Sequence, residues 1–469
     1  MILRSSLQSD QRKMGNMVAG IATSRIETVK QRETARFVAG NPRSRSLAAE
    51  AQAHFPDGVP MHWMTDWGTP FPLFVAEARA ARLVDVDGHT YHDFCLGDTG
   101  SMFGHSPDPI LRVLAEQGGY GLTYMLPTAD VPVIGRLLAE RFGLPQWQVA
   151  ATATDANRFA LRWARAITGR PKILVFNGCY HGTVDETFVR LKDGRAVHRP
   201  GLLGQATDLT MGTRVVEFND LPALEQALSA RDVACVITEP ALTNIGMVLP
   251  APGFLDAVQA ACRATGTLLL IDETHTISTG PGGWTRAHGL KPDFFVVGKA
   301  IAGGVPCAVW GFTDAIAAGM KRARAEAGPG HSGMGTTLSA NALALRALRA
   351  NLEHVMTDAA YDHMLTLSAR LADGVRAVIA AHGLPWHVSA VGARAEFVCG
   401  PTPPRNGSEA ATTMHGDLEA AIHLFLMNRG FLIAPFHNMT LTCPATTEDD
   451  VDRLVACIAA ACDDLLVGA

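Results

Sequence analysis

The segment LLLIDETHT (268–276) places four apolar residues directly before two carboxylates, Asp272 and Glu273. A short apolar run of this kind is typical of a strand that is buried on both faces of a sheet, so the carboxylates fall at its carboxyl end. Amphipathic stretches, for example at 254–266, separate it from similar runs. These runs lie at 172–176, 215–218, 234–238 and 294–298. Strands that alternate with helices predict a mainly parallel sheet covered by helices.

Three parts of the chain differ in pattern. Residues 1–95 begin polar and Arg-rich, and we expect them to form an arm and a hairpin that join a smaller domain. Residues 96–345 carry the parallel-sheet pattern of a large α/β domain. Residues 346–469 turn helical and then show short strands, as in a small α+β domain.

Local signals refine the two outer parts. Between Phe74 and Phe94, apolar and polar residues alternate around Asp87-Gly88, which predicts an antiparallel hairpin. The turn-rich stretch 400–410 is expected to be a surface loop. Thr447, followed by Asp450, predicts a capped start to the last helix.

Composition restricts the partners and the location. A formal charge of −5 and a pI near 6.4 provide no basic face for nucleic acid, so we expect a small-molecule substrate. The chain shows neither a secretion-signal core nor an apolar run long enough to span a bilayer. Its nine cysteines form no C-x-x-C pair and no zinc-ligand cluster, so we expect no bound metal. We expect these cysteines to be buried, reduced thiols and the protein to be cytoplasmic.

Lys299 follows the apolar run at 294–298 and so joins Asp272 at the carboxyl edge of the predicted sheet. Either residue alone is more often a surface or capping residue. Together they provide what an aldehyde cofactor requires: the amine forms an imine, and the carboxylate keeps a pyridine nitrogen protonated. The pair therefore predicts pyridoxal 5'-phosphate as cofactor, with Thr274 packing against the ring.

A phosphate anchor is expected where ATATDANRFALRWAR (151–165) runs from a small-residue turn into an amphipathic helix. Free N–H groups at a helix N-terminus, together with the hydroxyls of Thr152 and Thr154, suit a dianion. An ordinary capped helix explains the same pattern.

Further polar and aromatic residues follow neighbouring strands. Tyr180, next to His181, can stack on a flat ring, although a tyrosine at a strand end is often simply half-buried. Glu239 and Asn244 can donate or accept hydrogen bonds near the site, or hold turns.

The order of six motifs makes the chain resemble the class III aminotransferases of fold type I, from about residue 55 to the C-terminus. The motifs are ATATDANRFALRWAR, YHG (180–182), ITEP (237–240), LLIDE (269–273), GKAIAGG (298–304) and GTTLSANALA (335–344). Four others are similar to the branch that holds glutamate-1-semialdehyde aminomutases and β-amino-acid aminotransferases. They are FPDGVPMHWM (55–64), VDVDGHTYHDF (84–94), MFGHSPDP (102–109) and RGFLIAP (429–435). This resemblance implies a seven-stranded, mainly parallel sheet in the large domain.

The resemblance also implies roles for single residues. Lys299 is expected to hold the cofactor as a Schiff base and to shift protons, and Asp272 to pair with the pyridinium. Ala153 and Thr154 are expected at the phosphate. Three more positions match the family: Tyr180 on the ring, Asn244 near its phenolic oxygen, and Thr337 at the phosphate of a neighbouring subunit. The last of these implies a homodimer with its sites at the interface.

The chain departs from the family where related enzymes bind a substrate carboxylate. The segments that often hold an arginine read VPMHWM (59–64) and APFHNM (434–439), with His62 in the first. Histidine lacks the permanently charged fork of arginine, so an amine donor without that carboxylate becomes plausible. Arg394 is a candidate to bind the substrate carboxylate in place of the missing arginine, or to act as a movable gate. The alternative is an exposed or salt-bridged arginine with no role in the site. Trp63 is expected beside His62 in the substrate pocket or as interface filler.

Small-residue positions also differ. Ala151 to Asp155 replace the family's usual Asn-Ser-Gly-Thr-Glu, and Thr336 and Ala340 stand where glycines are common. Backbone donors survive these changes, so we expect cofactor binding with altered local geometry.

These observations favour an aminotransferase that moves an amino group from an amine or amino acid to an oxo acceptor in two half-reactions. An aminomutase similar to glutamate-1-semialdehyde 2,1-aminomutase and a β-amino-acid aminotransferase are the alternatives. A cofactor-binding transcription regulator needs a nucleic-acid-binding module, for which residues 1–60 are too short and unpatterned.

Overall fold

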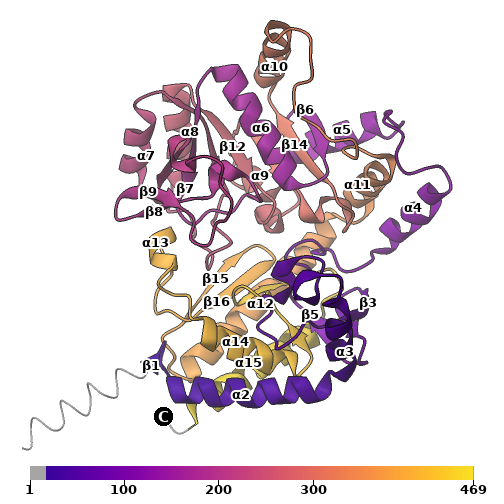
Figure 1. Ribbon diagram of the computed structural model, residues 1–469, viewed down its shortest axis with the longest axis vertical. Coiled ribbons are helices and arrows are strands. Elements are labelled where there is room, and N and C mark those ends of the chain that lie inside the picture. The colour runs from indigo at the N-terminus through magenta and orange to yellow at the C-terminus, as the bar shows by residue number, and fades with distance from the viewer. Residues whose placement is uncertain (1–16, 468–469) are drawn as a thin grey trace, which may run out of the picture. The chain divides into compact units, whose positions relative to one another are not determined.

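The computed structural model describes residues 17–467, which form two compact units (Figure 1). The small unit consists of residues 17–98, 364–403 and 413–467, and the large unit of residues 99–363 and 404–412. The three-part division at residues 95 and 345 stays a prediction.

A mainly parallel seven-stranded sheet forms the centre of the large unit, as predicted. Its strand order is β10 (Thr213–Val216), β7 (Lys172–Phe176), β11 (Val233–Thr238), β12 (Leu268–Asp272), β13 (Phe294–Val297), β14 (Ala308–Phe312) and β6 (Gln146–Ala150). The first five strands run parallel, and β14 is antiparallel to both of its neighbours. The carboxyl ends of the five parallel strands therefore lie at one edge.

The residue pattern explains which strands the sequence predicts well. The apolar runs at 172–176 and 268–272 coincide with β7 and β12, because strands buried on both faces carry few polar residues. The run at 215–218 was placed two residues too late for β10. The edge strand β6 was missed, because it carries the polar residues Gln146 and Gln148 in a short alternating pattern.

Helices surround this sheet in Figure 1, with α6, α7 and α8 labelled around β7 and β12. The helices of the large unit are α4 (Asp108–Gly118), α5 (Val131–Phe142), α6 (Ala153–Thr168), α7 (Leu221–Leu228), α8 (Phe254–Thr265), α9 (Gly283–Ala287), α10 (Asp314–Glu326), α11 (Ala342–His354) and α13 (Gly407–Ala410). In the core between helices and sheet, the rings of Phe176, Phe218 and Phe254 pack edge to face. A two-stranded ribbon, β8 (Val189–Lys192) and β9 (Arg195–His198), follows β7.

The small unit packs helices against two small sheets. Its helices are α2 (Thr23–Gly40), α3 (Pro42–Ala51), α14 (Gly416–Met427), α15 (Glu448–Leu466) and most of α12 (Asp358–Ala381). The strand order of the first sheet is β17 (Phe431–Leu432), β5 (Thr90–Asp93), β4 (Arg82–Asp85) and β3 (Val75–Arg79). The strand order of the second sheet is β15 (His387–Val391), β16 (Arg394–Val398) and β18 (Met439–Leu441). A separate antiparallel pair consists of β1 (Met17–Val18) and β2 (Ile21–Ala22). In Figure 1, the indigo helix α2 runs beside the yellow helices α14 and α15.

Three local predictions meet different outcomes. The capping of α15 is confirmed, because the Thr447 hydroxyl accepts from Asp450 N–H and the Asp450 carboxylate accepts from Thr447 N–H. The hairpin that turns at Asp87-Gly88 is confirmed by the antiparallel pair β4 and β5, but β3 also pairs with β4, because Ala80 adopts a left-handed conformation and adds a second turn. The loop predicted at 400–410 ends in α13, which Asn406 caps.

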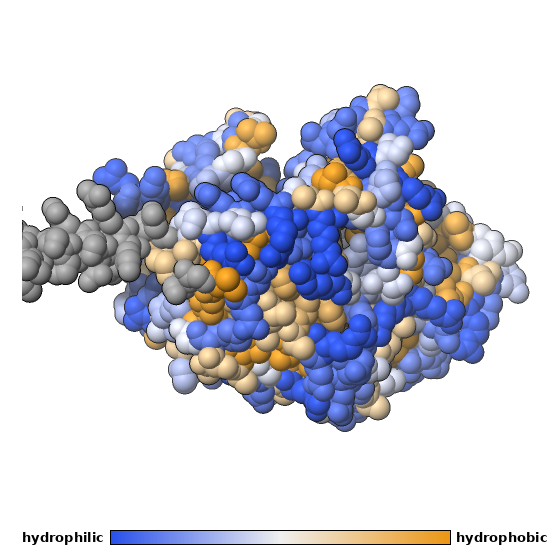
Figure 2. All heavy atoms as spheres, turned by 90° about the horizontal axis from the view of Figure 1, so that it is seen from below, coloured by the Kyte–Doolittle hydropathy of each residue, from blue (hydrophilic) through white to orange (hydrophobic). Residues whose placement is uncertain are grey.

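The surface is mixed in hydropathy. On the face drawn in Figure 2, hydrophilic areas surround smaller hydrophobic ones. Among the described residues, no helix combines the length and apolar character that crossing a bilayer requires. All nine cysteines are buried free thiols, as expected.

Candidate active site

Asp272 ends β12 with its carboxylate buried and hydrogen-bonded on both oxygens. Oδ2 lies 2.9 Å from His181 Nδ1 and accepts a 2.9 Å bond from the side-chain amide of Asn157. Oδ1 accepts the N–H of Thr274 at 3.1 Å. Burial alone raises the pKa of the Asp272 carboxyl, but the hydrogen bond and positive charge of His181 outweigh it, so the pKa falls below its usual value. Asp272 is thus held as an anion.

His181 forms the other half of this buried ion pair. Burial lowers the pKa of its imidazole, but the bond to Asp272 outweighs burial and raises the pKa well above the usual value. Asn157, on the buried face of α6, joins the pair by also donating to the His181 carbonyl at 3.2 Å. Asn157 was not among the predicted site residues, although a polar residue on the apolar face of an amphipathic helix signals a buried hydrogen-bonding role.

Lys299 begins the short 3₁₀ helix η6 (Lys299–Ala302), directly after β13. Its backbone has a φ of 47°, in the left-handed region that non-glycine residues rarely occupy. The preceding residue, Gly298, donates its N–H to the Thr274 hydroxyl at 3.3 Å. This bond ties the loop after β13, which holds Lys299, to the loop that directly follows Asp272.

The Lys299 amine contacts a residue to which the sequence analysis gave no role. Its Nζ lies 2.5 Å from Nε2 of His275, and Nδ1 of His275 lies 2.5 Å from the Thr243 hydroxyl. That hydroxyl is in turn 2.5 Å from a carboxylate oxygen of the buried Glu239, which follows β11. Thr243 was also missed, because only the loop conformations bring these four residues together.

The N-terminus of α6 borders these loops. Thr152 is its N-cap, with its hydroxyl accepting from Asp155 N–H. The Thr154 hydroxyl accepts the N–H of Thr183 at 3.1 Å, so its own proton stays available for another acceptor. A Cβ on Gly182 would lie 2.1 Å from the Thr154 hydroxyl oxygen, so this loop approaches the helix closely.

A second glycine makes a similar approach from the Lys299 side. A Cβ on Gly298 would lie 2.9 Å from the Cβ of Ala153. The loops after β7 and β13 therefore both reach the first turn of α6, where backbone N–H groups have no acceptor within the helix.

The other predicted cofactor residues of the large unit lie in loops. Tyr180 is half-buried after β7, with the Arg199 guanidinium 6.0 Å from its ring centroid. Asn244 is half-buried in the turn after β11. Thr337 is exposed in the segment 327–340, which contains no helix or strand.

The predicted substrate residues belong to the small unit. His62 and Trp63 open the 3₁₀ helix η2 (His62–Thr65), and both are exposed. Arg394 begins β16 and is fully buried, with its Nη1 3.8 Å from an oxygen of Asp98. The alternative of an exposed arginine at 394 is therefore wrong.

Comparison with known proteins shows the family of this chain. The sequence model of the class-III aminotransferases matches residues 63–461. The chain belongs to this family. A glutamate-1-semialdehyde aminomutase structure from Pseudomonas aeruginosa PAO1 is 48% identical, with a TM-score of 0.93, and covers 95% of this chain and 100% of its own.

Two further relatives differ more in sequence. A glutamate-1-semialdehyde 2,1-aminomutase from Anaeromyxobacter dehalogenans is 33% identical over 88% of this chain and 96% of its own length. The structure of a β-phenylalanine aminotransferase from Variovorax paradoxus is 27% identical, with a TM-score of 0.80, over 93% of this chain and 97% of its own. The predicted branch of the class III family is thereby confirmed.

Pyridoxal 5'-phosphate is the cofactor, as a variant of the P. aeruginosa enzyme in complex with PMP also indicates. The site suits this group. The anionic Asp272 matches a pyridinium N–H, the Lys299 amine matches an aldehyde, and the first turn of α6 matches a phosphate dianion.

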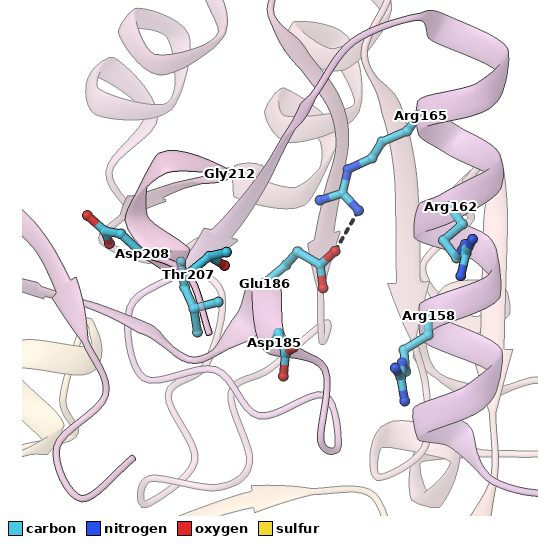
Figure 3. Close-up of a pocket in the computed structure, with 9 residues that line it drawn as sticks. Arg158, Arg162, Arg165, Asp185, Glu186, Thr207, Asp208 and Gly212 are labelled. Carbon is cyan, nitrogen blue, oxygen red and sulfur yellow. Dashed lines mark hydrogen bonds and ion pairs between the residues drawn. The ribbon is translucent and has the colours of Figure 1, made fainter. Parts of the chain in front are cut away.

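A separate hollow of this class III chain lies on the large unit and is lined by charged side chains from α6 and the loops beyond β7 (Figure 3). Arg158 and Arg162 point into it, and Arg165 forms a 2.5 Å ion pair with Glu186. The residues that line it do not include Lys299 or Asp272, so it is distinct from the candidate active site.

Proposed function

We propose that the protein is an aminotransferase that moves an amino group from an amine donor to an oxo acceptor in two half-reactions. Pyridoxal 5'-phosphate supplies an aldehyde that takes up the amine and a ring that accepts electrons. Lys299 holds this group and moves the proton between the two carbons that exchange the amine. Asp272 keeps the ring nitrogen protonated, because its own carboxylate stays ionised.

The remaining residues hold the cofactor. Thr152, Ala153 and Thr154 bind the phosphate with backbone N–H groups and hydroxyls of the first turn of α6. In this proposal, Tyr180 stacks on the ring, Thr274 packs against it, and Asn244 lies near its phenolic oxygen. Thr337 reaches the phosphate of the neighbouring subunit, so the active form is a homodimer. Its buried, reduced thiols support a cytoplasmic location.

The replacement of the usual arginine by His62 carries the proposal about the donor. His62 is exposed and has no permanent charge with which to fix a carboxylate. Arg394 does not take over the role of that arginine in binding a carboxylate, because Arg394 is fully buried and its Nη1 lies 3.8 Å from an oxygen of Asp98. These two observations support a donor that bears an apolar group beside its amine and no carboxylate.

An aminomutase is the second candidate, because the 48% identical structure carries the name glutamate-1-semialdehyde aminomutase. It would use Lys299 and Asp272 in the same way but return the amino group to another carbon of the same molecule. A β-amino-acid aminotransferase is the third, supported by the likeness to the V. paradoxus enzyme.

An absorbance titration of the loaded protein separates the three. We expect an arylalkyl amine to convert the aldehyde form of the cofactor to its amine form, and an α-amino acid and a β-amino acid to act much more slowly. Conversion only by carboxylate-bearing donors contradicts the proposed donor class and gives Arg394 the anchoring role. Isomerisation of glutamate 1-semialdehyde without any added oxo acceptor favours the aminomutase. Lys299→Ala is the control and should show no turnover with any donor.

A further inference from the structure

Four side chains of the large unit form a continuous row that ends at the reactive amine; His275, Thr243 and Glu239 are buried, and Lys299 is half-buried. Lys299 Nζ lies 2.5 Å from His275 Nε2, and His275 Nδ1 lies 2.5 Å from Thr243 Oγ1. Thr243 Oγ1 lies 2.5 Å from Glu239 Oε2, and Thr243 N–H also points to Glu239 Oε1 at 3.4 Å. Thr243 and Glu239 are 0% and 3% exposed, so water does not carry protons along this row in their place.

Hydrogen-bond chemistry fixes the direction of the row. An ionised Glu239 only accepts, so the single Thr243 proton goes to it. The Thr243 oxygen must then accept from Nδ1–H of His275. In a neutral imidazole this leaves a lone pair on Nε2, aimed at the Lys299 amine. The row therefore presents an acceptor to Lys299.

We propose that His275 is a positioning residue for Lys299, and that Thr243 and Glu239 complete a proton relay that takes up the proton of the Lys299 ammonium. One N–H bond of Lys299 breaks and Nε2–H of His275 forms. The Nδ1 proton passes to the Thr243 oxygen, and the Thr243 hydroxyl proton passes to Glu239. The charges on Lys299 and Glu239 both vanish, and the amine is left ready to attack or to accept a proton.

The pKa of Glu239 supports its role as the final proton acceptor of the relay. Burial raises the pKa of its carboxyl to about 7, so the group can hold a proton near neutral pH. His181 opposes this effect by lowering the Glu239 pKa, and Asp272 adds to it. The neighbouring carboxylate Glu273 is occupied elsewhere, accepting bonds from Thr276, Trp284 and Thr285.

The test compares two isosteric changes. Thr243→Val interrupts the relay while leaving its shape, whereas Thr276→Val removes an equally buried hydroxyl that donates to Glu273 at 2.5 Å. The pH dependence of acylation of Lys299 by acetic anhydride, read by peptide mass spectrometry on the cofactor-free full chain, reports the loss of its proton. Because the Thr243 hydroxyl lowers the pKa of Glu239, Thr243→Val favours a protonated, uncharged Glu239 and removes a negative charge from the row. We therefore expect Thr243→Val to lower the midpoint by about one pH unit, and Thr276→Val to leave it unchanged.

Three further variants sharpen the outcome. His275→Leu removes the acceptor of the Lys299 ammonium and should lower the midpoint at least as much as Thr243→Val, and Thr243→Ser should restore the parent value. In the loaded enzyme, Thr243→Val should lower kcat about tenfold at neutral pH, because the row no longer takes up the proton of Lys299. Equal midpoints in the parent, Thr243→Val and His275→Leu would overturn the relay, and Thr243→Val keeps the test decisive if His275→Leu does not fold.

This inference rests on the proposed role of Lys299, yet the two fail separately. Acylation involves no amine donor, so a shifted midpoint with no transamination by any donor defeats the proposed function and leaves the relay standing. Transamination by the parent, together with an unshifted midpoint in the variants, supports the proposed function and defeats the relay.

Discussion

At the scale of single residues, the ion pair between His181 and Asp272 keeps the Asp272 carboxylate negatively charged. Both side chains are buried, and a carboxylate in such a place is unstable without a compensating cation. Asn157 and the N–H of Thr274 satisfy further lone pairs of the carboxylate. The site thus carries an anion before any cofactor arrives.

His181→Gln should destabilise the protein by about 3 kcal/mol near pH 6, because it leaves Asp272 buried without its cation. The raised pKa of His181, about 10, means that its contribution is complete below pH 6.5 and is lost as pH rises through about 10. The lowered pKa of Asp272, about 2, means that its contribution is complete above pH 3.8 and is lost as pH falls through about 2. Urea unfolding of parent and variant should therefore differ most between about pH 4 and pH 6.5 and converge above about pH 10.

The exposed pair His198–Asp208 is the matched control. His198 lies 3.1 Å from the Asp208 carboxylate, with side chains 35% and 56% exposed. Because solvent screens such pairs, His198→Gln should leave the unfolding curve nearly unchanged. A loss as large as that of His181→Gln would mean that burial of the pair is not the cause.

Some of these residues could be predicted from the sequence, and others could not. Lys299 and Asp272 follow apolar strands, and the carboxyl ends of parallel strands meet at one edge, so their proximity could be predicted. His275 was left without a role because it stands in a loop, where nothing in the sequence fixes the direction of a side chain. Thr243 and Asn157 were missed because each contacts partners more than 30 residues away.

At the scale of elements, the cofactor site depends on how closely loops approach α6. Gly182 has a φ of 78°, and a Cβ there would lie 2.1 Å from the Thr154 hydroxyl oxygen. Thr154 is the residue whose free proton we assign to the phosphate. The loop after β7 and the first turn of α6 therefore form one cradle.

Gly182→Ala should weaken pyridoxal 5'-phosphate binding about tenfold or more, because the new methyl group displaces Thr154. Gly194→Ala is the control: Gly194 has a φ of 73° in the turn between β8 and β9, but a Cβ there meets nothing within 4 Å. Both variants carry similar backbone strain, of about 1 kcal/mol, so only the clash differs. Fluorescence titration with the cofactor measures the affinity, and equal affinities in the two variants would refute the cradle.

Whole elements were predicted as far as their residues carry a regular pattern. Strands β7 and β12 and the capped start of α15 follow from apolar runs and a capping pair. The turn at Ala80 was not predictable, because alanine rarely adopts a φ of 55° and gives no signal for it.

At the scale of the whole molecule, exposed apolar side chains occur next to Thr337 in the chain and in the segment 120–126. Leu338, its neighbour, is 59% exposed, and Met125 is 79% exposed in the segment 120–126. The carbonyl of Leu122 accepts the N–H of Leu343, which ties that segment to the start of α11 just beyond Leu338. Surfaces of this kind are typical of protein interfaces. They support the proposed homodimer in which Thr337 completes the phosphate site of the other subunit.

The double variant Met125→Asp with Leu338→Asp should therefore run at half the parent mass in light scattering after gel filtration, because a carboxylate placed in an apolar interface has no partner. The monomer should also lose most of its affinity for pyridoxal 5'-phosphate, since Thr337 no longer reaches a second site. Leu203→Asp changes a side chain that is 90% exposed in another loop of the large unit and should keep the parent mass. A double variant of parent mass would place the interface elsewhere, and a monomer with full cofactor affinity would remove Thr337 from the phosphate site.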